Sequence, residues 1–222
     1  MSNYSRFIAY GSSPITGNEL PAADRSLAFT ALIAKHLGIE YLCNGKPVTS
    51  NHKITRKITE FDYQPRDFVF VLWTAANRYE VPAETGWTGF TVNSRAESGI
   101  VREWIDGPGQ YEYTEICYTL EAMLIAQTFL SQKNIPYVFS IDNDAFINSY
   151  LFNNPTGYIE SLKNLISWNR FYLFDDSGFI DWSRKNNYPF TGTHAGVEAH
   201  AAASDHAITK WSGAFLQDQY NQ

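Results

Sequence analysis

The segment at residues 67–74 constrains the fold of this chain more than any other. It contains an unbroken apolar run, Phe-Val-Phe-Val-Leu-Trp, with no polar residue between the apolar ones. A half-buried strand alternates apolar and polar side chains, so this run predicts a strand that is covered on both faces. Strands of that kind occur in parallel sheets with helices on each side.

Strand and helix patterns alternate along the rest of the chain. We expect four further strands, at Arg6–Tyr10, Glu40–Cys43, Tyr137–Ile141 and 170–174. We expect helices over 26–37, 50–61, 111–132, 155–166 and 196–211. The alternation predicts an α/β fold, a three-layer α/β/α sandwich around a central parallel sheet. The sequence has no repeat, low-complexity block or linker, so we expect one domain over residues 1–222.

The ligand site of such a fold is expected beyond the carboxyl ends of the strands. That rule selects four loops, at residues 11–17, 44–51, 74–80 and 142–144. Residues 81–109 interrupt the alternation, and we interpret them as an excursion over the site rather than a second domain. The rings of Trp87, Phe90 and Trp104 in this excursion either pack it onto the core or form one wall of a pocket.

Composition excludes several classes of protein. The chain has 222 residues, 17 Lys and Arg against 23 Asp and Glu, and a formal charge of −6, so it lacks the basic character that binds nucleic acid. No apolar run approaches the about 20 residues of a membrane span, and the N-terminus lacks the apolar region of a signal peptide. Cys43 and Cys117 are expected to be free thiols. Together these features predict a soluble cytoplasmic protein.

Ser13 lies in the turn Gly11-Ser12-Ser13-Pro14 that follows the first expected strand. A serine on a tight turn between a strand and a helix can present its hydroxyl as a nucleophile, and its backbone N–H can face an oxyanion. Serine is also an ordinary turn residue, so this motif alone leaves both interpretations open.

Asn77 and His194 are the other candidate site residues. Asn77 follows the central strand, where its amide can donate to an oxyanion or simply support a turn. His194 lies in a glycine-containing turn before the last expected helix, as a general base or as a surface histidine. His194, His200 and His206 recur every six residues, which is not the spacing that places two metal ligands on one helix face, so we expect no metal.

A serine after the first strand, an asparagine after a later strand and a histidine before the last helix follow one another in this order. The order resembles that of the SGNH (GDSL-type) hydrolase family, and the resemblance spans nearly the whole chain. The chain is most similar to small SGNH-like proteins encoded by phages and marine microbes, whose first block reads Gly-x-Ser. The segments that carry the resemblance are residues 26–41, 50–54, 73–80 and 192–200.

The resemblance implies a role for four residues. Ser13 matches the nucleophile and His194 matches the general base. Val48 falls at the glycine of the second block, and Asn77 matches the asparagine of the third. The oxyanion would then be held by the backbone N–H groups of Ser13 and Val48 and by the amide of Asn77.

Two positions depart from the family pattern. Val48 replaces a glycine, and Thr191 stands where the family has the acid that orients the histidine. We expect that role to fall to Asp181 or Asp176, the nearest upstream carboxylates, or to a backbone carbonyl.

The resemblance implies a flavodoxin-like SGNH topology and hydrolysis of a carboxylic ester by acyl transfer, with no cofactor. The expected partner is a small-molecule or carbohydrate ester; the oligomeric state is open. If the chain is viral, it acts in the host cytoplasm or in the virion.

Two other functions compete with the hydrolase. The segment Thr16-Gly17-Asn18 resembles a flavodoxin phosphate loop, which would bind FMN, although Pro14-Ile15 enlarges the loop and Leu20-Pro21 delays the helix. The departures at Val48 and Thr191 instead suit a non-catalytic binding or virion structural protein on a degenerate SGNH fold.

Overall fold

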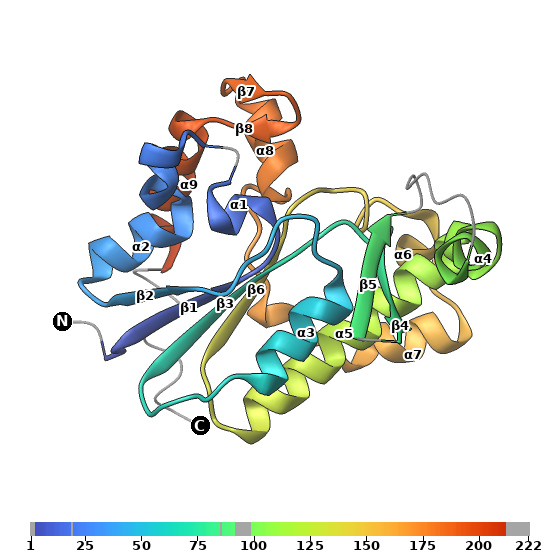
Figure 1. Cartoon of the computed structure of the whole chain (residues 1–222). Helices are drawn as coiled ribbons and strands as arrows, with labels where there is room; N and C mark the ends of the chain where they lie inside the picture. The colour runs from blue at the N-terminus through green and yellow to red at the C-terminus, as the bar shows by residue number, and fades with distance from the viewer. Residues whose placement is uncertain (1–2, 19, 85, 92–98, 212–222) are drawn as a thin grey trace.

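A four-stranded parallel sheet forms the centre of the molecule (Figure 1). This computed structural model describes residues 3–211 apart from 19, 85 and 92–98. The strands are β1 (Arg6–Tyr10), β2 (Glu40–Cys43), β3 (Asp67–Trp73) and β6 (Tyr137–Ile141), in the order β2-β1-β3-β6. The expected three-layer α/β fold with a parallel sheet is therefore confirmed. Residues 170–174 do not form the predicted strand, because only Phe171 bridges in parallel to Phe139 of β6.

The central strands are buried on both faces, as the apolar run of β3 predicts. Alternate side chains along each strand point to opposite faces of the sheet, so each face has its own apolar cluster. One face carries Ile8, Tyr10, Val69, Val71, Trp73, Phe139 and Ile141. The other face carries Phe7, Ala9, Phe68, Phe70, Leu72 and Val138.

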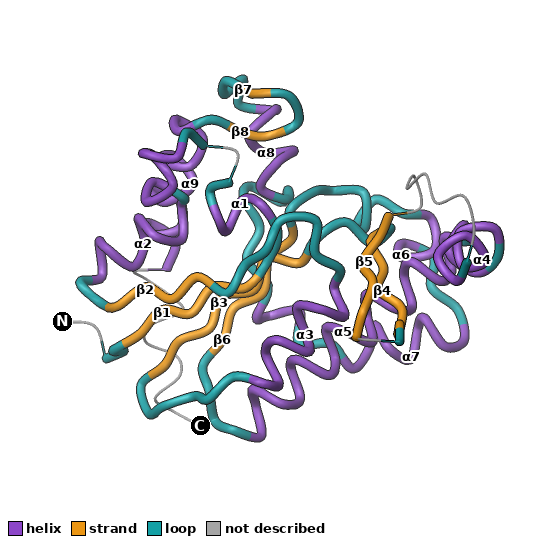
Figure 2. The backbone as a smooth tube through the Cα atoms, in the orientation of Figure 1, coloured by secondary structure: helices purple, strands orange, loops and turns teal. Residues whose placement is uncertain are grey.

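Helices cover both faces (Figures 1 and 2). The first face packs against α3 (Asn51–Glu60), α5 (Glu112–Gln132) and α7 (Gly157–Leu165). The second packs against α2 (Phe29–Leu37), α8 (Phe179–Lys185) and α9 (Val197–Trp211). None of the helices described by the structure is long and apolar enough to cross a membrane.

Helix boundaries differ from the sequence expectation mainly at α2. The predicted helix over 26–37 begins instead at Phe29, after a 3₁₀ helix at Ala22–Leu27, because Ala28 leaves helical geometry with ψ 137°. The start of α3 is marked by a capping residue. The Ser50 side chain accepts a hydrogen bond from the Lys53 N–H at 3.1 Å and so caps the helix.

Several shorter elements complete the fold. They are α1 (Ser13–Thr16), α4 (Ile100–Asp106), α6 (Tyr150–Asn153), the 3₁₀ helices Pro108–Gln110 and Trp168–Arg170, and the antiparallel pairs β4 (Arg78–Ala83) with β5 (Gly86–Thr91) and β7 (Phe190–Thr191) with β8 (His194–Ala195). The expected excursion thus contains the β4–β5 hairpin and α4. Phe90 is buried in it and Trp104 stacks near Tyr79 and Tyr118, so these two rings pack the excursion onto α5. Trp87 is half exposed and lies over Arg56.

Candidate active site at the carboxyl edge of the sheet

A buried carboxylate joins the carboxyl ends of three strands. Asp142 follows β6, and its Oδ2 accepts hydrogen bonds from the hydroxyls of Ser12, after β1, at 3.2 Å and Thr74, after β3, at 3.0 Å. The Asp142 N–H donates to the Trp73 carbonyl oxygen at 2.9 Å. Asp142 therefore holds together the loops after these three strands, in which a ligand site is expected.

The environment of Asp142 is unusual for a carboxylate. It is 2% exposed, and burial raises its pKa to about 6 from an ordinary value of 3.8. The nearby charge of Arg78 and the hydrogen bonds from Thr74, Ser12 and Asn143 oppose this rise. Titratable groups with raised pKa values cluster at functional sites, which makes this edge of the sheet a candidate site.

Asn51, the first residue of α3, fixes the loop after β3. Its Oδ1 accepts the Thr74 N–H at 2.9 Å, and its Nδ2 donates to the Thr74 carbonyl oxygen at 3.2 Å and to Thr119 Oγ1 at 3.1 Å. The Asn51 amide thus pairs with both backbone groups of Thr74, as a neighbouring strand would. From the sequence we assign no role to Asn51 or Asp142. Their positions are the only available signal: Asp142 directly follows a predicted strand, and Asn51 directly follows the serine that caps a helix.

Ser13 is the first residue of α1 and lies at this edge, 7% exposed. Its carbonyl oxygen accepts hydrogen bonds from Gly17 N and the Thr16 hydroxyl. Its own hydroxyl has no hydrogen bond within the described residues. Gly11 permits the close turn, because a Cβ there would lie 2.7 Å from Ile15 Cγ1.

His194 lies on β8, which packs against α8. The Ile180 N–H at the start of α8 donates to the Asp142 carbonyl oxygen at 2.7 Å, and α8 contacts β8, which contains His194 (Figure 1). The buried Nδ1 of His194 finds no hydrogen-bond partner in the described part of the chain. Thr191 is the cross-strand partner of His194 in the β7–β8 hairpin.

The two carboxylates expected near His194 have other contacts. Asp181 Oδ2 accepts the Asp144 N–H at 2.6 Å, and its Oδ1 accepts from Arg184 at 3.1 Å. Asp176 is exposed and lines the cavity that also contains His206. The structure therefore brings neither carboxylate into a hydrogen bond with the imidazole.

Two of the three expected oxyanion residues, Val48 and Asn77, lie in the loops that follow β2 and β3. Val48 has φ 51° and is 64% exposed. A β-branched residue is rare in this left-handed region, which glycine enters without strain, so the backbone here has the conformation that a glycine suits. Asn77 is half buried in the turn between β3 and β4, and its side chain has no hydrogen bond to another described residue.

The phosphate-loop interpretation of Thr16-Gly17-Asn18 loses its context in the structure. This segment ends α1 instead of beginning a helix, since Gly17 is its left-handed C-cap and the Thr16 hydroxyl donates to the Ser13 carbonyl oxygen. A helix start is what presents N–H groups to a phosphate. Among the described residues, no three His, Cys, Asp or Glu side chains group as metal ligands.

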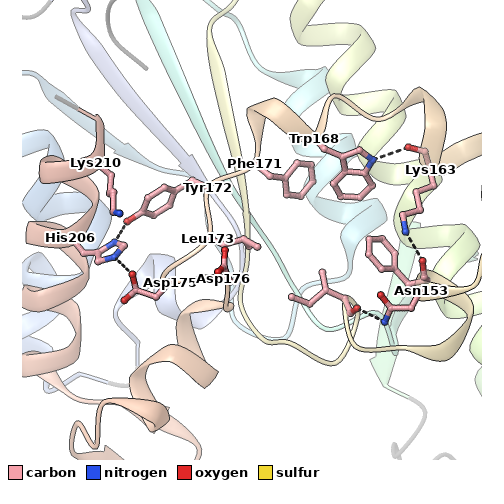
Figure 3. A pocket seen from close by; sticks show the side chains of 12 residues that line it. Asn153, Lys163, Trp168, Phe171, Tyr172, Leu173, Asp175, Asp176, His206 and Lys210 are labelled. Atoms are coloured by element: carbon pink, nitrogen blue, oxygen red, sulfur yellow. Dashed lines mark hydrogen bonds and ion pairs between the residues drawn. The ribbon is translucent and has the colours of Figure 1, made fainter. Parts of the chain in front are cut away.

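A cavity of about 830 Å³ lies beyond the β6 edge of the sheet, apart from the Asp142 site (Figure 3). Trp168 and Phe171 face it from one side, and Tyr172, His206 and Lys210 from the other. Asp175 Oδ1 lies 3.0 Å from His206 Nε2, and the other ring nitrogen bonds the Tyr172 hydroxyl. Because a carboxylate only accepts, Nε2 donates, and in the neutral ring Nδ1 accepts from Tyr172. This network ties α9 to the sheet edge.

These features define a class: a three-layer α/β protein whose polar site lies at the carboxyl edge of a parallel sheet. No protein-family model and no curated protein matches the chain. Solved structures do match. A member of the lipolytic G-D-S-L family from Veillonella parvula is 11% identical with a TM-score of 0.54, over 94% of this chain and 99% of that one.

Two esterases are similar to the same extent. A psychrotrophic esterase from a Pseudoalteromonas species is 11% identical with a TM-score of 0.53, over 94% of this chain and 98% of that one. An acetyl xylan esterase from Butyrivibrio proteoclasticus is 12% identical with a TM-score of 0.53, over 94% of this chain but 63% of that one. The chain therefore has the fold of the SGNH (GDSL-type) hydrolases, which confirms the resemblance at the level of fold.

Proposed function

We propose that this chain is a carboxylic ester hydrolase that works by acyl transfer, with Ser13 as nucleophile and His194 as general base. The observation that carries the proposal is the set of hydrogen bonds around Asp142. They join the Ser12-Ser13 turn to the start of α8, and α8 contacts the strand of His194. The fold likeness to esterases supports the same reaction class.

The proposed reaction has two halves. His194 removes the proton from the Ser13 hydroxyl as the oxygen attacks the ester carbonyl carbon. The resulting oxyanion is held by the N–H groups of Ser13 and Val48 and by the Asn77 amide. The tetrahedral intermediate expels the alcohol, which takes the proton from His194, and water then releases the acid from the acyl-enzyme by the same steps.

The substrate is proposed to be a small-molecule or carbohydrate ester. One similar structure is an acetyl xylan esterase, and another is a carbohydrate esterase. The second is 9% identical, over 96% of this chain and 65% of that one. No cofactor takes part in the proposed reaction. The resemblance to phage-encoded proteins stays a prediction.

The test is hydrolysis of 4-nitrophenyl acetate by purified protein. We expect Ser13→Ala and His194→Ala each to lower kcat/KM by about 10³-fold or more, with unchanged circular dichroism. Ser161→Ala is the control, because it removes an exposed serine hydroxyl of α7 and leaves the Ser12-Ser13 turn intact. Equal activity of wild type and Ser13→Ala would contradict the proposal.

A non-catalytic binding protein is the second candidate. Two observations favour it: Thr191 stands in place of the acid, and Nδ1 of His194 has no hydrogen-bond partner among the described residues. No described group then fixes the tautomer of the base. A wild-type protein that hydrolyses no short-chain aryl ester, yet folds cooperatively, would favour this alternative.

A further inference from the structure

Three lysines line a cavity beside the turn of Ser13. The cavity, of about 240 Å³, lies between the loop that follows β1 and the loop between β2 and α3. Lys46, Lys53 and Lys57 line it together with backbone and small polar groups, and no carboxylate lies among its lining residues. Such a concentration of positive charge is notable in a chain with a net charge of −6.

The cavity is lined in part by Gly11, which belongs to the same turn as the proposed nucleophile. The Lys46 N–H donates to the Gly11 carbonyl oxygen at 3.0 Å, two residues before Ser13. Gly45 packs so closely on α1 that a Cβ there would lie 2.9 Å from the side chain of Ile15. A ligand group held in this cavity would therefore lie next to the Ser13 turn.

The lysines are gathered at an electrostatic cost. Lys53 and Lys57 are four residues apart on α3, and like charges at that spacing repel. Lys53 also lies in the first turn of α3, where the helix dipole disfavours a cation. Burial and the charges of Lys46, Arg56 and Lys57 lower the pKa of Lys53.

Nearby carboxylates offset this cost only in part. Glu80 attracts Lys53, but both oxygens of Glu80 accept hydrogen bonds from Arg56 at 2.9 Å. Lys57 pairs with Glu60 at 3.5 Å on the exposed side of α3. Lys46 and Lys53 have no ion pair within the described residues. An anion in the cavity would offset the repulsion directly.

We propose that this cavity binds a negatively charged group of the substrate, a carboxylate, phosphate or sulfate, and so selects anionic esters for Ser13. The inference rests on the proposed ester hydrolysis and adds the substrate class. The ester carbonyl lies at Ser13 while the charged group of the same molecule occupies the lysine-lined cavity.

The kinetic test compares two matched acetates, 4-carboxyphenyl acetate, which is anionic, and 4-carbamoylphenyl acetate, which is neutral. We expect the ratio of their kcat/KM values, anionic over neutral, to fall about tenfold in Lys53→Gln and in Lys46→Gln, the scale of a lost hydrogen bond to a charged group. Lys35→Gln, which removes an exposed lysine of α2, is the control and keeps the wild-type ratio. An unchanged ratio in both cavity variants would overturn the proposal.

A binding test separates this proposal from the proposed catalysis. Millimolar sodium sulfate, compared with sodium chloride at equal ionic strength, should raise the Tm of wild type and Lys35→Gln more than that of Lys53→Gln. General salt effects act on all three proteins alike. An equal shift in all three overturns the anion site. Sulfate stabilisation without hydrolysis of either acetate supports the anion site and overturns the proposed hydrolase.

Discussion

Asp142 couples the stability of the candidate site to pH. Its pKa is raised to about 6 in the folded protein against 3.8 for the ordinary side chain, chiefly by burial. Between about pH 4 and 6 the folded state therefore binds more protons than the unfolded state, so the free energy of unfolding falls as pH rises through this range and levels off above it.

Replacing the carboxylate removes this dependence. We expect Asp142→Asn to flatten the stability profile between pH 4 and 6 and to raise stability at pH 7.5 by up to about 3 kcal/mol. The amide oxygen can still accept from Ser12 and Thr74. Urea unfolding at pH 4.5, 6 and 7.5 measures the effect, with the exposed Asp205→Asn as control. A variant that is less stable at pH 7.5 and keeps the wild-type slope would contradict this role of burial.

Gly11 is a residue at which the surrounding atoms leave no room for a side chain. Its φ is 153°, and an added Cβ would lie 2.7 Å from Ile15 Cγ1 and 2.8 Å from the Leu72 carbonyl oxygen. We expect Gly11→Ala to cost more than about 3 kcal/mol, because backbone must move. Gly38→Ala, with φ 66° but open space around it, should cost about 1 kcal/mol. Thermal unfolding compares the two, and equal losses would refute the steric argument.

The β7–β8 hairpin contains His194. Thr191 is directly opposite His194, and such cross-strand neighbours share one face with Cβ atoms about 5 Å apart. We expect Thr191→Asp to place a carboxylate beside the imidazole and to raise kcat/KM for 4-nitrophenyl acetate at least about tenfold. Thr191→Asn is the control without charge. No gain in Thr191→Asp over Thr191→Asn would argue against His194 as the base.

Asp181 lies on α8, and within the described residues its hydrogen bonds are to groups other than His194. Its carboxylate bonds Asp144 N and Arg184, so it fixes α8 against the loop after β6. We expect Asp181→Asn to lower kcat less than tenfold and to leave the pH profile of kcat in place, since the imidazole keeps its surroundings. A loss of 10³-fold or more would restore Asp181 as the group that orients His194.

Regular elements were predictable because their signals are local. The apolar run of β3 continues along the strand, and Ser50 marks the start of α3 with its own side chain. The strand predicted at 170–174 is wrong because only one bridge pairs it with β6, although its apolar side chains alternate between the two faces as they would in a strand. The two-residue strands β7 and β8 are too short to leave a periodic pattern.

At the scale of the whole molecule, the sheet decides which distant residues meet. The sequence predicts that loops after parallel strands share an edge, and the hydrogen bonds of Asp142 to Ser12 and Thr74 fulfil that expectation. It could not predict the partners within the edge, such as Asn51 on Thr74, because these depend on how α3 is set against β3 and α5. The roles of Ser13, Val48, Asn77 and His194 stay predictions.

Ser13 is proposed to be a nucleophile that His194 activates. Reaction with a fluorophosphonate, followed by mass spectrometry of the digested protein, tests it most directly, because only an activated serine reacts rapidly. One similar esterase structure is an inhibited form with monoethylphosphonate. We predict one label, on Ser13 and not on Ser12, with the labelling rate at least about 100-fold lower in His194→Ala. No label on wild type, or a label whose rate is unchanged in His194→Ala, would contradict it.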